Sequence, residues 1–561
     1  MSEMNLPPLS MRLENRVGMR RGILLLCVLF LLLTLPWILS QCELFRQEGV
    51  FAAVASGYAD SRWNPALGFA AQAHDMPLSD VFPLYPFLVS LLYRCNVPME
   101  MALRIISTFM LGVLALLSGI AAGSRINKRA GIVAACCCFG TLFALGKGVF
   151  GGAEVMAACF LLAAQLLFFH YGSRLADWNS AWISSAIFLT LGFLTRGPVV
   201  ILFFIFPLFF LRRPLSFTGK FRTPGFLIGI AFLVLIILFW ALPLGISLRN
   251  YSDATDMGLL SSAVYWRDVL FFLVQFPLRM LPWSLIMWMP FCVALQAISP
   301  VPVFSRYLRT LFFANLALVW LLPGASSSLI FFLIGPLSIL TGLTYDLGVR
   351  RYGAWIRKAL IAGGLFFPVI MLVIIVLTFI PVRFLHLFGD PEKMMYREVF
   401  PGYIYLALGA LLMLMLLGFI YSFGRCRFPV WVQLVLICFG IGVFYTAEIL
   451  PYQMMNSNWR KLGNDIQKAL PENVSCLYKY EIDGLYSGLF YTKCPVRKLQ
   501  SLEDLENLGD TVYVISSQLP VDPGRVWTPL LPDDYRYGGV NVSLWRGVRR
   551  VEDENWEESN E

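Results

Sequence analysis

The sequence predicts an α-helical polytopic membrane protein with about thirteen transmembrane helices and a small α/β domain near its C-terminus. Hydrophobic residues make up 58% of the 561 residues, charged residues only 14%, and the mean hydropathy is +0.69. A soluble protein carries about 25% charged residues. The apolar residues form runs long enough to cross a bilayer, and only after Pro451 does the composition become that of a water-exposed domain. These observations predict the fold class.

The candidate transmembrane segments are runs of mainly apolar residues. A helix needs about twenty such residues to cross the bilayer, and fewer when it packs inside a bundle. The first run is long enough to span and is followed by no small-residue cleavage site, so we expect it to be retained rather than removed as a signal peptide. The predicted spans are 22–40, 102–124, 129–147, 153–171, 179–195, 198–212, 224–247, 282–298, 309–323, 327–345, 358–381, 403–423 and 429–448.

Basic residues predict the orientation of these spans, because cytoplasmic loops of membrane proteins are enriched in Lys and Arg. Every second connection is basic, and all of these connections fall on the side of the N-terminus. The net charge of +9 comes from such short clusters, which argues against binding of nucleic acid. The clusters are Arg12/Arg16/Arg20/Arg21, Arg125/Lys128/Arg129, Arg174, Arg212/Arg213/Lys220/Arg222, Arg306/Arg309, Arg350/Arg351/Arg357/Lys358 and Arg425/Arg427.

This pattern predicts a multi-pass membrane protein. The N-terminal tail, 1–21, is expected in the cytoplasm and the transmembrane domain over 22–450. Two outward loops, 41–101 and 248–281, and the C-terminal domain, 451–550, are expected on the opposite, non-cytoplasmic side, which the resemblance described below implies is the periplasmic side of the inner membrane. The acidic tail, 551–561, is expected to be disordered.

The C-terminal domain has the local patterns of mixed α and β structure. Residues 459–469 read as an amphipathic helix, 474–480 and 511–516 as short strands, and 502–508 as a second helix. Cys476 and Cys494 both fall in this domain. In an extracytoplasmic compartment they could form a disulfide, and two unpaired thiols are the equally open alternative.

Three carboxylates stand at predicted outward positions: Glu48 after the first span, Asp80 near the end of the polar stretch 45–87 of the first outward loop, and Glu154 at the start of the fourth span. If the helices form a bundle, these positions could converge. Such a group could deprotonate a nucleophile or bind a divalent cation, with Asp80 and Glu48 as the metal ligands. The alternatives are that Glu48 and Asp80 are solvated loop residues and that the helix dipole alone favours Glu154.

Basic and aromatic residues at the same predicted side suit a lipid-linked phosphate. Arginine binds phosphate with a planar fork and lysine with a point charge. An interfacial role without a ligand is the alternative for these residues and for the tryptophans among them. The phosphate candidates are Arg196, Lys147, Arg249 and Arg267, and the candidates to line a substrate cavity are Tyr85, Trp63 and Trp283.

Five short motifs occur along the chain in a fixed order: QEGVFA, DSRWNP, DVFPLY, LGFLTRGP and LPWS. They occupy 47–52, 60–65, 80–85, 191–198 and 281–284. Together with the number of spans, the motifs resemble the polytopic glycosyltransferases of the GT-C superfamily. The similarity is to the branch that contains the bacterial aminoarabinose transferases and the protein O-mannosyltransferases.

The resemblance implies a function and also shows departures. It implies that a sugar is transferred from a polyprenyl-phosphate donor to an envelope acceptor (lipid A, another glycan or a protein) at the periplasmic side, with inversion. Gln47 stands where the family has an acidic residue, Val81 where it has a lysine, and Phe82 where it has a proline, whereas Arg196 keeps the positive charge of the family's lysine. A diverged, non-catalytic binder of lipid-linked sugar and a lipid or sugar transporter are therefore open alternatives. A transporter would need polar residues deep within its spans.

Overall fold

The structure is a computed structural model. It describes single residues and pairs between positions 30 and 44, then 48–60, 82–211, 222–241, 263–322, 329–379, 429–444 and 459–471, and most of 474–549 in short stretches. The chain divides into two compact units. The first comprises Met1–Ser40, Leu78–Tyr85 and Leu103–Tyr452, and the second comprises Gln41–Pro77, Pro86–Ala102 and Gln453–Glu561. The second unit thus joins residues of the first outward loop to the C-terminal domain.

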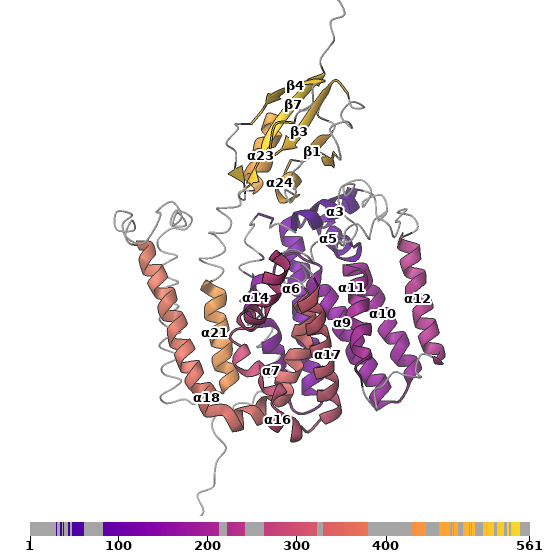
Figure 1. Cartoon of the computed structure of the whole chain (residues 1–561), viewed down its shortest axis with the longest axis vertical. Coiled ribbons are helices and arrows are strands. Elements are labelled where there is room, and N and C mark those ends of the chain that lie inside the picture. Colours follow the sequence, from indigo (N-terminus) through magenta and orange to yellow (C-terminus); the bar gives the residue numbers. More distant parts are fainter. Residues whose placement is uncertain are drawn as a thin grey trace, which may run out of the picture. The chain divides into compact units, whose positions relative to one another are not determined.

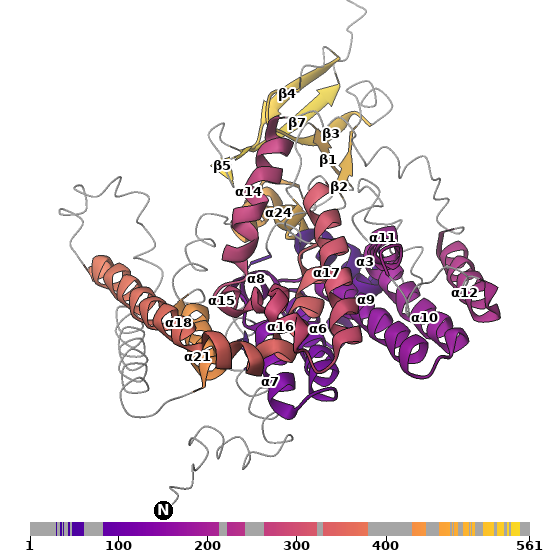
Figure 2. The same cartoon turned by 60° about the horizontal axis from the view of Figure 1, so that its bottom comes forward.

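The first unit is helical (Figures 1 and 2). The helix α6 (Met99–Gly123) begins in the second unit and runs into the first. The remaining described elements are α7 (Lys128–Phe139), α8 (Leu142–Lys147), α9 (Glu154–Phe169), the π-helix η1 (His170–Arg174), α10 (Trp178–Arg196), α11 (Pro198–Leu208), α12 (Pro224–Ala241), α14 (Ala263–Arg279), α15 (Ser284–Met287), the 3-10 helix η5 (Met289–Phe291), α16 (Val293–Ala297), α17 (Pro302–Leu321), α18 (Phe331–Phe379) and α21 (Val430–Phe444).

By length and composition, three of the described helices could cross a membrane: Met99–Gly123, Glu154–Ser173 and Phe331–Ala362. A fourth candidate is a pair of helical pieces, Val269–Arg279 and Ser284–Phe291, bent by 106° at the break between them. Shorter apolar helices cover other predicted spans. The protein is therefore helical and suited to a membrane, as predicted, whereas the number of thirteen spans stays a prediction.

Several predicted boundaries differ from the structure. The spans 327–345 and 358–381, expected as separate helices, lie in the single continuous helix α18 of 49 residues. The connection between them, 346–357, contains Gly348 and Gly353 but no proline, and its basic residues are good helix formers, so it changes the polarity of the helix without ending it. Conversely, 282–298, expected as one span, is divided into α15, η5 and α16 (Figure 2), and Pro290 in η5 removes one of the helix hydrogen bonds there. Residues 263–279, expected in an outward loop, form α14.

Small residues allow the central helices of this unit to approach closely. A Cβ atom at Gly131 would collide with the carbonyl oxygen of Gly119, which brings α7 against α6. In the same way Gly342 of α18 lies directly against the backbone of Ala130 in α7. Close backbone approach through small residues is the usual way in which helices associate in a membrane, where the hydrophobic effect contributes little.

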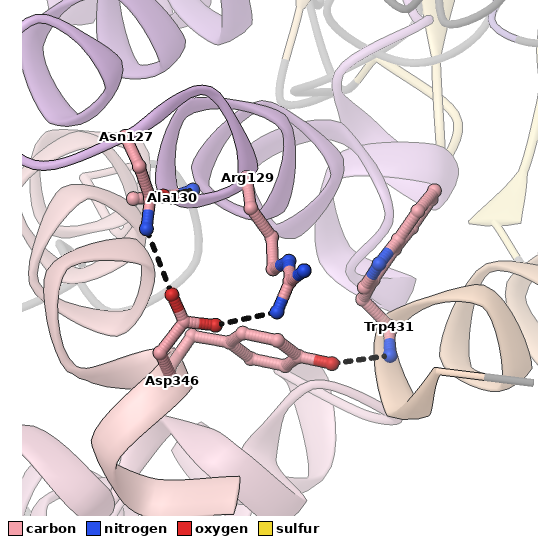
Figure 3. A network of polar contacts seen from close by, with 6 residues as sticks. Asn127, Arg129, Ala130, Asp346 and Trp431 are labelled. Atoms are coloured by element: carbon pink, nitrogen blue, oxygen red, sulfur yellow. Dashed lines mark hydrogen bonds and ion pairs between the residues drawn. The ribbon is translucent and has the colours of Figure 1, made fainter. Parts of the chain in front are cut away.

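Several predicted cytoplasmic connections gather at one end of the first unit. Asp346 of α18 accepts hydrogen bonds from Asn127 Nδ2 at 2.8 Å and Arg129 Nη1 at 3.2 Å at the start of α7 (Figure 3). The backbone N–H of Trp431, at the start of α21, donates to the Tyr345 hydroxyl at 3.0 Å. The connections before α7 and α21 and the middle of α18 therefore share one end. Which side of the membrane this end faces stays a prediction.

The second unit contains a small α/β fold. Its helices are α3 (Glu48–Asp60), most of α5 (Leu84–Arg94), the first turn of α6, α23 (Trp459–Ala469) and α24 (Tyr486–Phe490). Five strands form a mixed sheet in the order β2-β1-β3-β7-β4, in which β1 pairs in parallel with β2 and β3, and β7 pairs antiparallel to β3 and β4. The strands are β1 (Leu477–Tyr480), β2 (Val496–Lys498), β3 (Thr511–Ser516), β4 (Arg525–Pro529), β5 (Arg536–Tyr537), β6 (Val540–Asn541) and β7 (Ser543–Arg549).

The local predictions for this domain agree with the structure at α23 and β3, which have the expected bounds, and in part at β1. The apolar face of α23 (Trp459, Leu462 and Ile466) packs in one core with Leu477 of β1 and Ile515 of β3. The helix predicted over 502–508 lies outside the described residues. Cys476 and Cys494 are both described, and no disulfide joins them.

Candidate functional site

Glu154 is the first residue of α9 and is held close to the backbone that precedes it. A Cβ atom at Gly152 would collide with Oε2 of Glu154, so the carboxylate in its present position lies against the backbone of Gly152. The N-cap residue, Ala153, provides no side-chain hydrogen bond to the helix. The free N–H groups and the dipole at this end of α9 favour a negative charge on Glu154.

Arg196 is the last residue of α10, and the following Gly197 joins α10 to α11. Gly197 has φ 77° and ψ −158°, a conformation that side chains with a Cβ rarely adopt, and its N–H donates to the carbonyl oxygen of Phe193 at 2.7 Å. Pro198 then starts α11, where its missing N–H costs nothing. The LTRGP part of the motif at 191–198 is therefore the junction that sets the direction of the Arg196 side chain.

The structure brings Glu154 and Arg196 together as an ion pair. Arg196 Nη2 lies 3.7 Å from Glu154 Oε1, and their side chains are 20% and 10% exposed. This separation exceeds hydrogen-bond length, so the carboxylate neutralises the guanidinium without a close fork-to-carboxylate contact. A partly exposed arginine held in this way can exchange its contact for a stronger one with a phosphate.

Phe82 fixes the end of the first outward loop beside this pair. Its ring lies directly over Gly197 and packs edge-on against Phe193, with ring centroids 5.6 Å apart. A side chain at position 197 would collide with the ring. The chain at Phe82, two residues after Asp80 in the sequence, is therefore anchored at the residue that follows Arg196.

A second set of contacts supports Glu154 from the side of α5 and α6. The Tyr85 hydroxyl donates to the carbonyl oxygen of Leu103 at 2.9 Å and lies 2.9 Å from the Ser107 hydroxyl. Ser107 Oγ in turn accepts from the N–H of Gly152 at 3.0 Å. Tyr85, predicted to line a substrate cavity, is fully buried, and its contacts hold the loop that carries Glu154 in place.

Glu48 belongs to the second unit, where it is the first residue of α3 and 1% exposed. A carboxylate at the first position of a helix benefits from the free N–H groups there. Its burial shows that Glu48 is not an ordinary solvated loop residue, which was the alternative interpretation. The two units are described separately, so its distance from Glu154 stays a prediction.

The other predicted site residues fall into two groups. Lys147 ends α8 with an exposed side chain, Arg267 is exposed near the start of α14, and Trp283 is fully buried against Gly140. The ion pair that the structure gives at this site consists of Arg196 and Glu154, on α10 and α9, and these three residues lie on or beside other elements. Asp80, Arg249 and Trp63 lie outside the described residues.

A divalent metal ion does not fit the described part of this site. Across the described ranges, no three His, Cys, Asp or Glu side chains form a group that could hold one. The carboxylate of Glu154 already faces a cation, Arg196, which would repel a metal ion. Asp80, the first predicted ligand, lies outside these ranges, so we derive no chemical step from a metal.

Sequence reasoning missed Arg104 of α6, which is fully buried. It lies next in sequence to Leu103, whose carbonyl oxygen binds Tyr85, and one helical turn before Ser107. The signal was visible, because an arginine inside an otherwise apolar span is expensive to bury and is a functional candidate for that reason. We therefore add Arg104 to the candidate residues.

The first unit, with a charged pair at one end of α9 and α10, and the second unit, with its small mixed sheet, define the class: a helical protein suited to a membrane that also carries a small α/β fold. The particular likeness is to ArnT from Cupriavidus metallidurans. Its solved structure in the apo state aligns with a TM-score of 0.63 and 15% sequence identity over 94% of this chain and 97% of that chain. The structure of ArnT bound to undecaprenyl phosphate gives a TM-score of 0.64 and 15% identity over 93% and 97%.

No family model matches the sequence, and no curated protein matches it. At 15% identity the structural likeness establishes the fold alone. It confirms the resemblance to GT-C proteins that the five motifs indicated, and it covers the helical bundle and the C-terminal domain together.

Proposed function

We propose that this protein is an integral membrane glycosyltransferase that uses a polyprenyl-phosphate sugar as donor. The observation that carries the proposal is the ion pair of Arg196 and Glu154 at the junction of α10 and α11. It provides a partly exposed cation at the end of the bundle opposite to the basic connections. The fold supports the same donor class, because a solved protein with this fold was found with undecaprenyl phosphate bound.

The proposed reaction is a single displacement at the anomeric carbon. The bond between C1 of the sugar and the phosphate oxygen breaks, and its electron pair leaves with the lipid phosphate. A bond forms between C1 and an acceptor oxygen at the opposite face, so the configuration inverts. The proton of the acceptor passes to a carboxylate, with Glu48, Asp80 and Glu154 as candidates.

Arg196 supplies the electrostatic part of this mechanism. Negative charge grows on the phosphate oxygens as the C1–O bond breaks, and a cation placed there beforehand stabilises the transition state more than the ground state. We assign the phosphate to Arg196 first and to Lys147, Arg249 and Arg267 as further contacts. Glu154 holds the guanidinium in position before the donor arrives.

We place the reaction on the periplasmic side of the inner membrane. The proposed acceptor is an envelope component (lipid A, another glycan or a protein). The surrounding lipids hold the polyprenyl tail of the donor. This placement rests on the basic connections gathered at the other end of the bundle. A divalent metal near Asp80 and Glu48 is an extension of the proposal that chelation with EDTA would test.

The test is transfer of radiolabelled sugar from a polyprenyl phosphate to extracted envelope acceptors by the purified protein. Arg196→Gln should lower the rate by about 10²–10³-fold, as for the loss of a donor to a developing charge. Arg129→Gln, at the opposite end of the bundle, is the matched control and should keep the wild-type rate. Equal rates for both variants would refute the assignment of Arg196.

The same assay separates the alternative functions. Saturable binding of the donor without any labelled product would identify a non-catalytic binder, which the replacements at Gln47 and Val81 make worth testing. Movement of the intact labelled donor across a proteoliposome membrane, without transfer, would identify a transporter. Either result would refute the proposal that the protein is a glycosyltransferase.

A further inference from the structure

The C-terminal domain forms hydrogen bonds with Glu43 and Leu44, which closely follow the first predicted span. The N–H of Leu44 donates to the Tyr491 hydroxyl at 3.2 Å. The carboxylate of Glu43 accepts hydrogen bonds from the backbone N–H groups of Trp459 and Arg460 at the start of α23. Two consecutive residues, four and five positions before Glu48, are thus bound to helices that follow them by more than four hundred residues.

Arg460 of α23 and Tyr491, the residue directly after α24, also bind Glu100 at the start of α6. Tyr491 Oη donates to Glu100 Oε1 at 3.0 Å, and Arg460 Nη2 donates to the same oxygen at 2.9 Å. The guanidinium of Arg460 also lies over the Tyr491 ring, 5.3 Å from its centroid. Burial raises the pKa of Tyr491, so its hydroxyl stays protonated at neutral pH and can serve Leu44 as acceptor and Glu100 as donor at once.

Glu100 is the better buried partner of this ion pair, with its side chain 12% exposed against 41% for Arg460. A carboxylate with so little access to water depends on its two donors, because an unsatisfied buried charge is costly. The hydrogen bonds of Glu100 are therefore expected to persist. They tie α6 to α23 and α24 within the second unit.

The first turn of α3 rests directly on α24. A Cβ atom at Gly49 would collide with the backbone of Ser487, so the two helices touch through their main chains. Gly49 follows Glu48 immediately, and Glu48 is itself 1% exposed. The position of Glu48 is thereby set by α24 at the next residue, and by Leu44 and Glu43 a few residues earlier.

We propose that α23, α24 and the residue after α24, Tyr491, position Glu48, a carboxylate that the proposed function assigns to proton transfer. Tyr491 and Arg460 are positioning residues: they act through Leu44, Glu100 and the start of α3. The inference deepens the proposed function, because it rests on Glu48 as a carboxylate of the reaction. The alternative is a C-terminal domain that only binds the acceptor. Such a domain would not require contacts with the residues before Glu48.

The experiment uses full-length protein in membranes or detergent, with Tyr491→Phe and Arg460→Gln as test variants. Tyr491→Phe keeps the ring and removes only the hydroxyl. Arg546→Gln is the matched control, because Arg546 is an exposed arginine of the same domain on β7. Arg460→Lys keeps one charged donor toward Glu100 and serves as the conservative rescue.

The first measurement is amide hydrogen exchange. Tyr491→Phe should speed exchange at Leu44 and along 48–60 by at least about tenfold, whereas Arg546→Gln should leave both unchanged. This measurement needs no substrate. Unchanged exchange in Tyr491→Phe would overturn the inference whatever the protein catalyses.

The second measurement is steady-state transfer. A displaced carboxylate should lower kcat by about 10- to 100-fold and leave the KM for the lipid-linked donor near its wild-type value. Arg460→Lys should recover part of kcat, and Tyr491→Phe added to Glu48→Gln should cause no further loss. Full kcat in Tyr491→Phe and Arg460→Gln would overturn the positioning role. A wild-type protein that transfers no sugar refutes the proposed function instead, and the exchange measurement then still decides whether α24 holds this segment.

Discussion

Replacing Gly197 by alanine tests the junction that directs Arg196. At φ 77° and ψ −158° this residue occupies a region that is nearly restricted to glycine, and placing alanine there costs about 1–3 kcal/mol. The new methyl group would also meet the ring of Phe82, and overpacking of this kind costs about 1–3 kcal/mol. We expect Gly197→Ala to destabilise the folded protein by about 3 kcal/mol or more.

Gly146→Ala is the control for this variant. Gly146 lies inside α8, and a Cβ atom there would meet no other atom within 4 Å. Alanine is preferred over glycine inside a helix by about 0.5–1 kcal/mol, so this variant should be as stable as the wild type or slightly more stable. The two glycine replacements are therefore expected to change the free energy of unfolding in opposite directions.

The assay is reversible unfolding of the purified protein in mixed micelles with increasing denaturing detergent, monitored by tryptophan fluorescence. A double variant with Phe82→Leu separates the two contributions, because a smaller side chain relieves the collision and leaves the backbone strain. If Gly197→Ala unfolds within about 0.5 kcal/mol of the wild type, the described junction is wrong. If Phe82→Leu does not reduce the loss of unfolding free energy caused by Gly197→Ala, the described contact between Phe82 and Gly197 is wrong.

Three further predictions concern the charged groups. Glu154→Gln should lower sugar transfer at least about tenfold by releasing Arg196, measured as kcat/KM, and an unchanged value would exclude a role for the pair. Asp346→Asn should cost about 1 kcal/mol in the same unfolding assay, because its pair with Arg129 is part-exposed, and should leave transfer unchanged. Burial raises the pKa of Glu43 above its usual value of 4.5, so the protonated form favours folding below pH 4.5 and this advantage is lost as the pH rises through the raised pKa. Glu43→Gln should therefore raise the Tm at pH 7 and lose that gain below about pH 4.5; a lower Tm at pH 7 would contradict the direction of the shift.

Features with a local cause could be predicted from the residues alone. The amphipathic repeat of α23 and the strand β3 have the predicted bounds, since each depends on a short periodic pattern. The helical bundle follows from apolar runs that only a helix can carry through lipid. Glu154 and Arg196 could be assigned to the same end, because α9 and α10 are consecutive, antiparallel helices.

Features that depend on tertiary packing could not be predicted from the sequence. The continuity of α18 through its basic residues, and the break of 282–298 into short helices, depend on neighbours that a hydropathy pattern does not contain. The bond from Tyr491 to Glu100 joins residues 391 positions apart, and no local rule couples them. Charge and hydropathy are properties of each segment by itself, so they predict on which side of the membrane a residue lies. Contact between two particular side chains depends on the shapes of both packed helices, so only the tertiary structure determines it.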